Sequence, residues 1–195
     1  MIPYGIWTDI FKPTAKQGGG NTGKIVVLAS AASLSHVNKG FHILLHTLQN
    51  RGDNSDIRLL IMGEDSEVRN VVFPGTLEVE FLGFVSAKEE KAAVYNRADC
   101  LAFPSFADNL PNSVIESVSC GTPVIAFNAG GMPDLVIEGV SGWICDKIDL
   151  DEYAEDIRIG YPAAETGRPS ARFLPGVCAK EFYAGYTSRE IQRTF

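Results

Sequence analysis

Residues 104–126 have the sequence PSFADNLPNSVIESVSCGTPVIA, which begins where one apolar run ends and closes on a second. The apolar run before it, Cys100–Phe103, is suited to a buried strand, and Pro104 ends that strand. At the other end of the stretch, Pro123 opens a second apolar run of the same kind. A polar loop and a segment of helical character lie between the two runs. The stretch therefore predicts a strand, a loop, a helix and a second strand, in that order.

The helix expected inside this stretch has recognisable ends. Pro111 presets the backbone for a first helical turn, and Ser113 and Glu116 have the spacing of a capping box. Gly121 lies where a glycine commonly ends a helix. A helix in this place presents unpaired N–H groups and a partial positive charge at the carboxyl end of a buried sheet. Such a helix start is a ready site for a phosphate.

The rest of the chain alternates expected strands with expected helices. Short apolar runs predict strands, and apolar residues three and four positions apart predict helices. Strands are expected at Ile25–Ala29, Ile57–Gly63 and Leu77–Leu82, a turn and a last short strand within Gly139–Cys145, and helices at Gly40–Leu48, Ser86–Ala98, Asp149–Ile159 and Val177–Arg193. The alternation predicts an α/β fold, a doubly wound and mostly parallel sheet of Rossmann-like type with helices on both faces. Ser86 and Glu89 have the spacing of a second capping box.

The composition of the 195-residue chain bounds its function. Hydrophobic residues make up 45% and charged residues 21%, which is ordinary for a soluble globular protein. The formal net charge of −7 argues against a nucleic-acid backbone as the main partner, so local features must meet an anionic ligand. The four cysteines lie far apart without a Cys-x-x-Cys pair, which is typical of reduced thiols in a cytosolic protein. We expect neither a membrane span nor a signal peptide.

Two other kinds of site are not expected. Gly18–Lys24 has the glycine spacing of a phosphate-binding loop, but Ile25 follows it in place of Ser or Thr, and the loop precedes a strand instead of following one. His36, His42 and His46 do not converge in an obvious way, and the chain has no Asp-x-Asp pair. The sequence therefore predicts no metal site.

A set of motifs around the central stretch falls in a specific order. Asp108 and Glu116 are acidic residues separated by seven others, and SCGTPVI (residues 119–125) and GGMPD (residues 130–134) follow them. This order resembles the C-terminal donor-binding domain of retaining glycosyltransferases with the two-domain GT-B fold (glycosyl transferases group 1, family 4). The first acidic residue is usually glutamate in that family, whereas Asp108 is one methylene shorter. The Asp-Asn-Leu-Pro-Asn form resembles a subgroup associated with capsule and exopolysaccharide assembly.

The resemblance implies a role for each candidate residue. Lys39, in a Lys-Gly pair, is expected to contact the diphosphate of a nucleotide sugar, and Glu116 to accept both ribose hydroxyls. The arginine that the family carries near this lysine has no counterpart from Ser30 to Asn38. The candidate catalytic residues are Lys39 and Asp108, the latter touching hydroxyls of the donor sugar. The candidate substrate-binding residues are Val85 at the nucleobase, Asn109, Leu110, Pro111, Asn112 and Ser113 around phosphate or sugar, Glu116, Gly130 and Gly131.

Each of these residues also has a structural interpretation. Lys39 can be an ordinary exposed lysine at a helix start, although that is an unfavourable place for a cation. Asp108 can form an Asx-turn, and Glu116 can serve in the capping box alone. Phe84, beside Val85, can be a core residue of a tight turn. Gly130–Gly131 can be a turn before a helix that starts at a proline.

The reaction that the resemblance implies is retaining transfer of a glycosyl group from a nucleoside diphosphate sugar to a hydroxyl acceptor, of hexosyltransferase type, in polysaccharide or lipopolysaccharide synthesis. Departure of the diphosphate builds negative charge, which Lys39 and the helix start would stabilise. The scheme needs no cofactor besides the donor substrate. Two alternatives stay open: a nucleotide-binding module inactive on its own, and a sugar-nucleotide epimerase of GT-B type. A dehydrogenase is disfavoured because no Gly-x-Gly-x-x-Gly follows the first strand.

The resemblance also implies a domain organisation. Residues 1–23 would be the interdomain linker and arm, with Trp7 and Phe11 packed on the domain surface, and residues 24–195 the nucleotide-sugar-binding domain. The chain would then be the C-terminal half of a GT-B enzyme without its N-terminal acceptor domain. A saccharide or lipid-linked acceptor would bind through that other domain. The full enzyme is expected in the cytoplasm, with peripheral association at the inner face of the membrane left open.

Overall fold

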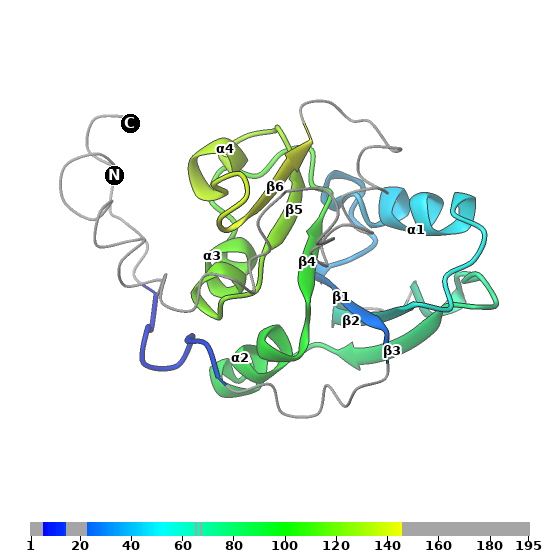
Figure 1. Cartoon of the computed structure of the whole chain (residues 1–195), viewed down its shortest axis with the longest axis horizontal. Coiled ribbons are helices and arrows are strands. Elements are labelled where there is room, and N and C mark those ends of the chain that lie inside the picture. The colour runs from blue at the N-terminus through cyan, green and yellow to red at the C-terminus, as the bar shows by residue number, and fades with distance from the viewer. Residues whose placement is uncertain (1–5, 15–22, 65, 67, 146–195) are drawn as a thin grey trace.

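The computed structural model describes residues 6–14, 23–64, 66 and 68–145 (Figure 1). The two helices expected at Asp149–Ile159 and Val177–Arg193 lie outside these residues, and so does Cys178. The glycine-rich run of the expected linker lies outside them as well, except for Gly23.

Six parallel strands form the centre of the fold (Figure 1). The strand order is β3-β2-β1-β4-β5-β6, and every neighbouring pair is parallel. The strands are β1 (Ile25–Ser33), β2 (Ile57–Glu64), β3 (Glu78–Gly83), β4 (Cys100–Phe103), β5 (Val124–Phe127) and β6 (Gly142–Cys145). The predicted Rossmann-like α/β fold is confirmed. Because chain order reverses between β1 and β4, the switch point of the sheet lies there.

Helices cover both faces of the sheet. They are α1 (Phe41–Asn50), α2 (Lys88–Arg97), α3 (Asn112–Ser119) and α4 (Met132–Leu135), with two 3₁₀ turns, η1 (Val37–Lys39) and η2 (Val68–Asn70). Figure 1 shows α1 on the opposite side of the sheet from α3 and α4. Each α-helix connects two parallel strands, or, for α4, lies within the connection from β5 to β6.

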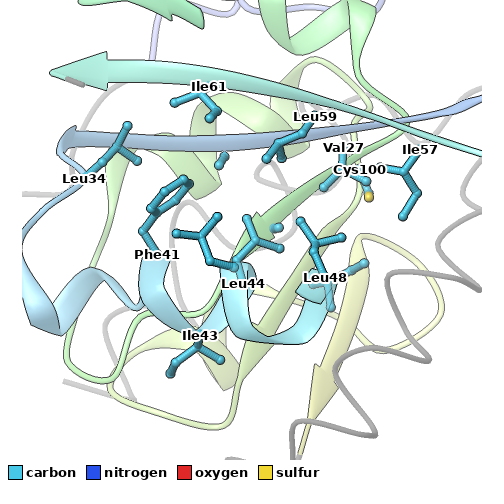
Figure 2. Packing of buried hydrophobic residues seen from close by; sticks show 14 of the residues in the cluster. Val27, Leu34, Phe41, Ile43, Leu44, Leu48, Ile57, Leu59, Ile61 and Cys100 are labelled. Carbon is cyan, nitrogen blue, oxygen red and sulfur yellow. The ribbon is translucent and has the colours of Figure 1, made fainter. Parts of the chain in front are cut away.

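The sheet divides the interior into two hydrophobic clusters. Along β1, Val27 and Ala29 belong to the cluster beneath α1, whereas Leu28 belongs to the cluster of α2 and α3. This alternation follows from the period of two along a strand. Figure 2 shows Phe41 and Leu44 of α1 pointing towards the strands. A strand buried on both faces needs a nearly continuous apolar sequence, which is what the central strands have.

Some boundaries differ from expectation. β1 continues to Ser33, four residues beyond Ala29, because small residues still pair with β2 across a register irregularity. The capping boxes are wrong in both helices. Ala87, without a side-chain hydrogen bond, precedes α2, and Pro111, in the extended conformation, precedes α3. Ser113 therefore lies inside the first turn of α3, where it does not act as the N-cap.

The C-terminal end of α3 agrees with expectation. Gly121 has a φ of +75°, and its N–H bonds the Val118 carbonyl at 2.9 Å. The N–H of Thr122 reaches back to the Ser117 carbonyl at 3.0 Å. These two bonds form a Schellman motif, which needs a residue at positive φ and so favours glycine.

The N-terminal arm, residues 6–14, packs on the α2–α3 side of the sheet. Phe11 is buried there and lies edge-on to the ring of Tyr95, with 6.4 Å between the centroids. Trp7 is 56% exposed, so only one of the two expected aromatic anchors is buried. The Lys88 ammonium sits 3.1 Å from the centroid of the Trp7 ring, which gives the exposed indole a cation–π contact.

The three cysteines in the described residues, Cys100, Cys120 and Cys145, are buried. None of the helices in the described part of the chain has both the length and the hydropathy that crossing a membrane requires.

Candidate functional site

The candidate residues lie in loops that follow the carboxyl ends of four strands. Lys39 follows β1, Val85 follows β3, residues 108–113 follow β4, and Gly130–Gly131 follow β5. In a parallel sheet these strand ends share one edge, and ligands bind outside it at the switch point. Because β1 and β4 flank that point, the loops carrying Lys39 and residues 108–113 are neighbours.

The structure joins two of the candidates directly. Lys39 Nζ lies 2.6 Å from Asp108 Oδ2, although the residues are 69 positions apart in the chain. The two side chains are 33% and 19% exposed, so water shields the ion pair only in part. The Asp108 carboxylate thus accepts a hydrogen bond from a lysine of another loop. In the Asx-turn alternative it would accept one from a backbone N–H of its own loop. A cation and an acceptor side by side can meet a phosphate and a hydroxyl of one ligand.

Backbone contacts hold these two loops together. The Asn38 carbonyl accepts the Phe106 N–H at 3.0 Å and the Ser105 hydroxyl at 2.9 Å. Gly40 has a φ of +68°, and a Cβ built on it would lie 1.8 Å from the Pro104 carbonyl oxygen. A side chain at this glycine would push the loops apart. The glycine that follows Lys39 therefore serves the close approach of η1 to the end of β4.

The two glycines after β5 pack closely against the loop that follows β4. The Gly131 N–H bonds the Asp108 carbonyl at 3.0 Å. A Cβ at Gly130 would lie 2.2 Å from the Asp108 carbonyl oxygen, and one at Gly131 would lie 1.8 Å from that of Asn109. The glycines thus let two loops pack backbone against backbone. The N–H of Gly131 is used inside the chain, and contact of either glycine with a ligand stays a prediction.

The start of α3 carries no side-chain cap. Pro111 is buried, extended and without a side-chain hydrogen bond to the helix. The first backbone bond onto its carbonyl comes from Val114, at 3.1 Å. Among the described residues, no acceptor bonds the N–H groups of Asn112 and Ser113. These two donors and the helix dipole are what an anion at this end of α3 would meet.

Glu116 lies one turn further along α3, in a different environment. Its side chain is half-buried, and Oε2 accepts the hydroxyl of Tyr95 at 3.0 Å. Burial raises the pKa of the Glu116 carboxyl, while the positive charge of Lys91 and the Tyr95 hydroxyl oppose that rise. The alternative that Glu116 caps the helix is wrong. No hydrogen bond or ion pair within the described residues joins it to Lys39 or Asp108.

Tyr95 is a residue that sequence reasoning missed. It is 1% exposed, and burial together with the nearby Glu116 charge raises its pKa well above the ordinary value. It lies 21 positions before Glu116 on another helix, so no local spacing links the two. The sequence indicates this contact only in general terms, because a tyrosine on a helix that packs against the sheet usually needs a hydrogen-bond partner for its hydroxyl.

The loop after β3 lies apart from this cluster. Phe84 is 69% exposed, so the alternative that places it in the core is wrong. Val85 is partly buried and packs against the cluster of α2 and α3. β3 is an edge strand of the sheet, two strands away from β1. In the described residues no hydrogen bond connects Val85 with the other candidates. Its expected role at a nucleobase stays a prediction.

The histidines have structural neighbours. His42 lies against the ring of Phe106, with centroids 6.1 Å apart, and His46 is bonded to Asn50. Across the described ranges, no three His, Cys, Asp or Glu side chains are grouped so that they could hold a metal ion.

Comparison with known proteins gives consistent matches. A family model described as Glycosyl transferases group 1 matches residues 25–159. D-inositol 3-phosphate glycosyltransferase of Corynebacterium efficiens is 31% identical over 175 residues, which cover 78% of this chain and 41% of the relative. The chain spans less than half the length of this and the other leading curated relatives that it matches.

Two solved structures have the same fold. The C-terminal domain of a glycosyl transferase group 1 family protein (LpcC) from Francisella tularensis has a TM-score of 0.65 at 18% identity, and the match covers 80% of this chain and 87% of that domain. HepE of Anabaena, in complex with UDP-glucose, has a TM-score of 0.62 at 22% identity over 79% of this chain and 45% of HepE.

Proposed function

We propose a function from one established premise: this chain belongs to the Glycosyl transferases group 1 family. It acts as the donor-binding domain of a glycosyltransferase, which holds a nucleoside diphosphate sugar for retaining transfer of the glycosyl group to a hydroxyl acceptor. The observation that carries this proposal is the Lys39–Asp108 pair beside the uncapped start of α3, at the switch point of the sheet. UDP-glucose bound to HepE, a protein of the same fold, supports a nucleotide sugar as the ligand.

The proposed mechanism is electrostatic. The diphosphate lies at the start of α3, where the N–H groups of Asn112 and Ser113 donate to its oxygens and the Lys39 ammonium pairs with it. Negative charge grows on this group as the glycosyl bond breaks. Donors that are fixed before the reaction stabilise that charge more than mobile water does. Lys39 therefore contributes to the rate as well as to binding, while Asp108 accepts hydroxyls of the sugar.

Two further contacts complete the donor site in this proposal. Glu116 accepts the ribose hydroxyls, and each such charge-assisted bond contributes on the order of 1.5–3 kcal/mol. Backbone groups around Val85 read the edge of the nucleobase, while Asn109 and Leu110 line the sugar. The family resemblance supplies these roles, and the placement of all the residues after strand ends on one edge supports them.

The acceptor belongs to another part of the enzyme. We propose that residues 1–23 correspond to an interdomain linker and residues 24–195 to the donor domain, because the match covers most of an isolated C-terminal domain and under half of HepE. The likeness of the Asp-Asn-Leu-Pro-Asn motif to a capsule and exopolysaccharide subgroup supports a role of the full enzyme in polysaccharide or lipopolysaccharide synthesis, with a saccharide or lipid-linked acceptor. No cofactor or metal enters the proposed scheme.

The second candidate is a nucleotide-binding module without turnover of its own. The short coverage of the relatives favours it for the chain by itself. Thermal denaturation with uridine, guanosine and adenosine diphosphates tests the function that both candidates share. We expect one nucleotide to raise the melting temperature with increasing concentration, because a ligand of the native state stabilises it. No rise with any of the three at millimolar concentration would contradict both candidates, and transfer of sugar by the isolated chain would contradict the second.

A further inference from the structure

A fully buried phenol is bonded to the candidate ribose ligand. The Tyr95 hydroxyl donates to Glu116 Oε2 at 3.0 Å, and Tyr95 itself is 1% exposed. A buried hydroxyl without a partner would destabilise the fold, so the bond to Glu116 is also needed to satisfy this hydroxyl. The Glu116 carboxylate accepts this bond through one of its two oxygens, Oε2.

Three contacts fix the position of Tyr95. The ring of Phe11 packs on it edge to face, with 6.4 Å between the centroids. Its carbonyl accepts the Thr122 hydroxyl at 2.7 Å, just beyond the end of α3, and the Ala98 N–H at 3.1 Å. Tyr95 therefore connects α2 to α3 at two points, through its carbonyl and through its hydroxyl. A side chain seated in this way can act as a rigid support for the group that it bonds.

We propose that Tyr95 is a positioning residue for ligand binding, which holds the Glu116 carboxylate in one orientation through Oε2 and leaves Oε1 for the ribose. The inference rests on the proposed function, because Glu116 is a ligand-binding residue only in that proposal. It adds a residue that touches neither nucleotide nor sugar and acts through Glu116 alone.

The charges around Glu116 give this role a second consequence. Burial raises the pKa of the Glu116 carboxyl, and Lys91 and the Tyr95 hydroxyl, both on α2, oppose that rise. Cys120, the C-cap residue of α3, is buried, and burial and the Glu116 charge raise the pKa of its thiol to about 12, so the thiol stays neutral at ordinary pH. Loss of the Tyr95 hydroxyl therefore raises the pKa of Glu116 further. The ionised form, which accepts two hydroxyls, then disappears at a higher pH.

The test is a titration of Tyr95→Phe with the nucleoside diphosphate that the parent binds most tightly of the uridine, guanosine and adenosine forms. We expect about fivefold weaker binding near neutral pH, because one bond to a charged group is lost while the ring stays. We also expect the fall in affinity at acid pH to begin at a higher pH than in the parent. Thr122→Val is the matched control, because it removes the other α2–α3 bond of Tyr95, the one to its carbonyl.

A double-mutant cycle separates positioning from general damage. In a Glu116→Ala background the Tyr95 hydroxyl has no side chain at position 116 to hold, so Tyr95→Phe should have little further effect on affinity. If Tyr95→Phe does not fold, Phe11→Leu replaces it, since this change keeps the hydroxyl but loosens the seat of the ring. We expect about twofold weaker binding for that variant, again only when Glu116 is present.

Several results would overturn the inference. Tyr95→Phe could bind and titrate like the parent, could lose no more affinity than Thr122→Val, or could lose as much affinity in the Glu116→Ala background as in the parent. Any of these would leave Tyr95 with a purely structural role while the proposed function stands. Parent protein that binds none of the three nucleotides would overturn the proposed function, and the inference with it.

Discussion

Lys39 and Asp108 form an ion pair of 2.6 Å between the loop that follows β1 and the loop that follows β4. The proposed function gives the lysine to the diphosphate and the aspartate to the sugar of one donor. An incoming diphosphate must then compete with Asp108 for the ammonium. The pair also keeps both side chains ordered at the switch point, which lowers the entropy that binding has to overcome.

Replacement of the lysine tests its role at the diphosphate. We expect Lys39→Met to weaken binding of the nucleoside diphosphate at least about tenfold, because a charge-assisted bond contributes on the order of 1.5–3 kcal/mol. Isothermal titration calorimetry measures the change. Lys24→Met is the control, since Lys24 pairs with Glu78 at 3.1 Å just before the start of β1. Equal losses in the two variants would show that net charge, and not the place of Lys39, governs binding.

Replacement of the aspartate should separate diphosphate from sugar. Asp108→Asn removes the competitor for Lys39 and a charge that repels phosphate. We therefore expect the preferred nucleoside diphosphate to bind about threefold more tightly, in line with the small energy of a partly exposed ion pair. A sugar derivative of the same nucleotide should gain less or lose affinity, because its sugar hydroxyls lose a charged acceptor. The ratio of the two dissociation constants, measured in parent and variant, reports the effect. An unchanged ratio would remove Asp108 from the sugar site.

The close approach of the two loops can be tested through stability. Gly40→Ala meets both a positive φ and the Pro104 carbonyl, whereas Gly52→Ala meets a φ of +81° with nothing within 4 Å. We expect Gly52→Ala to cost about 1–2 kcal/mol in the free energy of unfolding, and Gly40→Ala at least about 3 kcal/mol. Urea denaturation monitored by circular dichroism measures both. Equal costs would mean that the backbone contact between η1 and β4 is not formed.

The ion pairs of Glu80 with Arg58 and Arg97, outside the candidate site, predict a pH dependence of stability. Burial tends to raise the pKa of Glu80, but ion pairs with Arg97 and Arg58 outweigh it and hold the pKa below its ordinary value of 4.5. A carboxyl whose pKa is lower in the folded state stabilises the protein above its unfolded pKa, and this stability is lost as the pH falls through the folded value. Glu80→Gln should therefore weaken the acid dependence of the free energy of unfolding.

Urea denaturation of Glu80→Gln at a series of acid pH values measures this change. Glu90→Gln, on the exposed first turn of α2, is the control for removing one surface carboxylate. A dependence as steep in Glu80→Gln as in Glu90→Gln would contradict the assignment of the Glu80 network.

The strands and their class could be read from the sequence because each is a short apolar run between turn residues. Buried parallel strands need no more than this, and β4 and β5 were predicted to within a residue. Gly121 was also identified correctly, because a residue at positive φ leaves few alternatives. Both capping boxes were wrong. Spacing alone does not decide which residue ends the extended chain, and Pro111 and Ala87 do so here.

The pairings within the site could not be read from the sequence. Lys39 and Asp108 were both named as candidates, but their contact depends on β1 and β4 being neighbours across 69 positions of chain. Tyr95 was not named, because a buried hydroxyl bonded to Glu116 leaves no local pattern. The exposure of Phe84 was equally undecided, since an aromatic residue after an edge strand can turn either way.

In the proposed function a nucleotide binds across the start of α3 with its ribose on Glu116, and calorimetric titration of Glu116→Gln is the sharpest test of this placement. The amide keeps the shape of the side chain but loses the charge, and Glu89→Gln on α2 is the control for a surface carboxylate. We predict at least about tenfold weaker binding of the preferred nucleoside diphosphate to Glu116→Gln, since two charge-assisted bonds are weakened, and no change for the control. Equal affinities for Glu116→Gln and the parent would show that the ribose does not lie on Glu116.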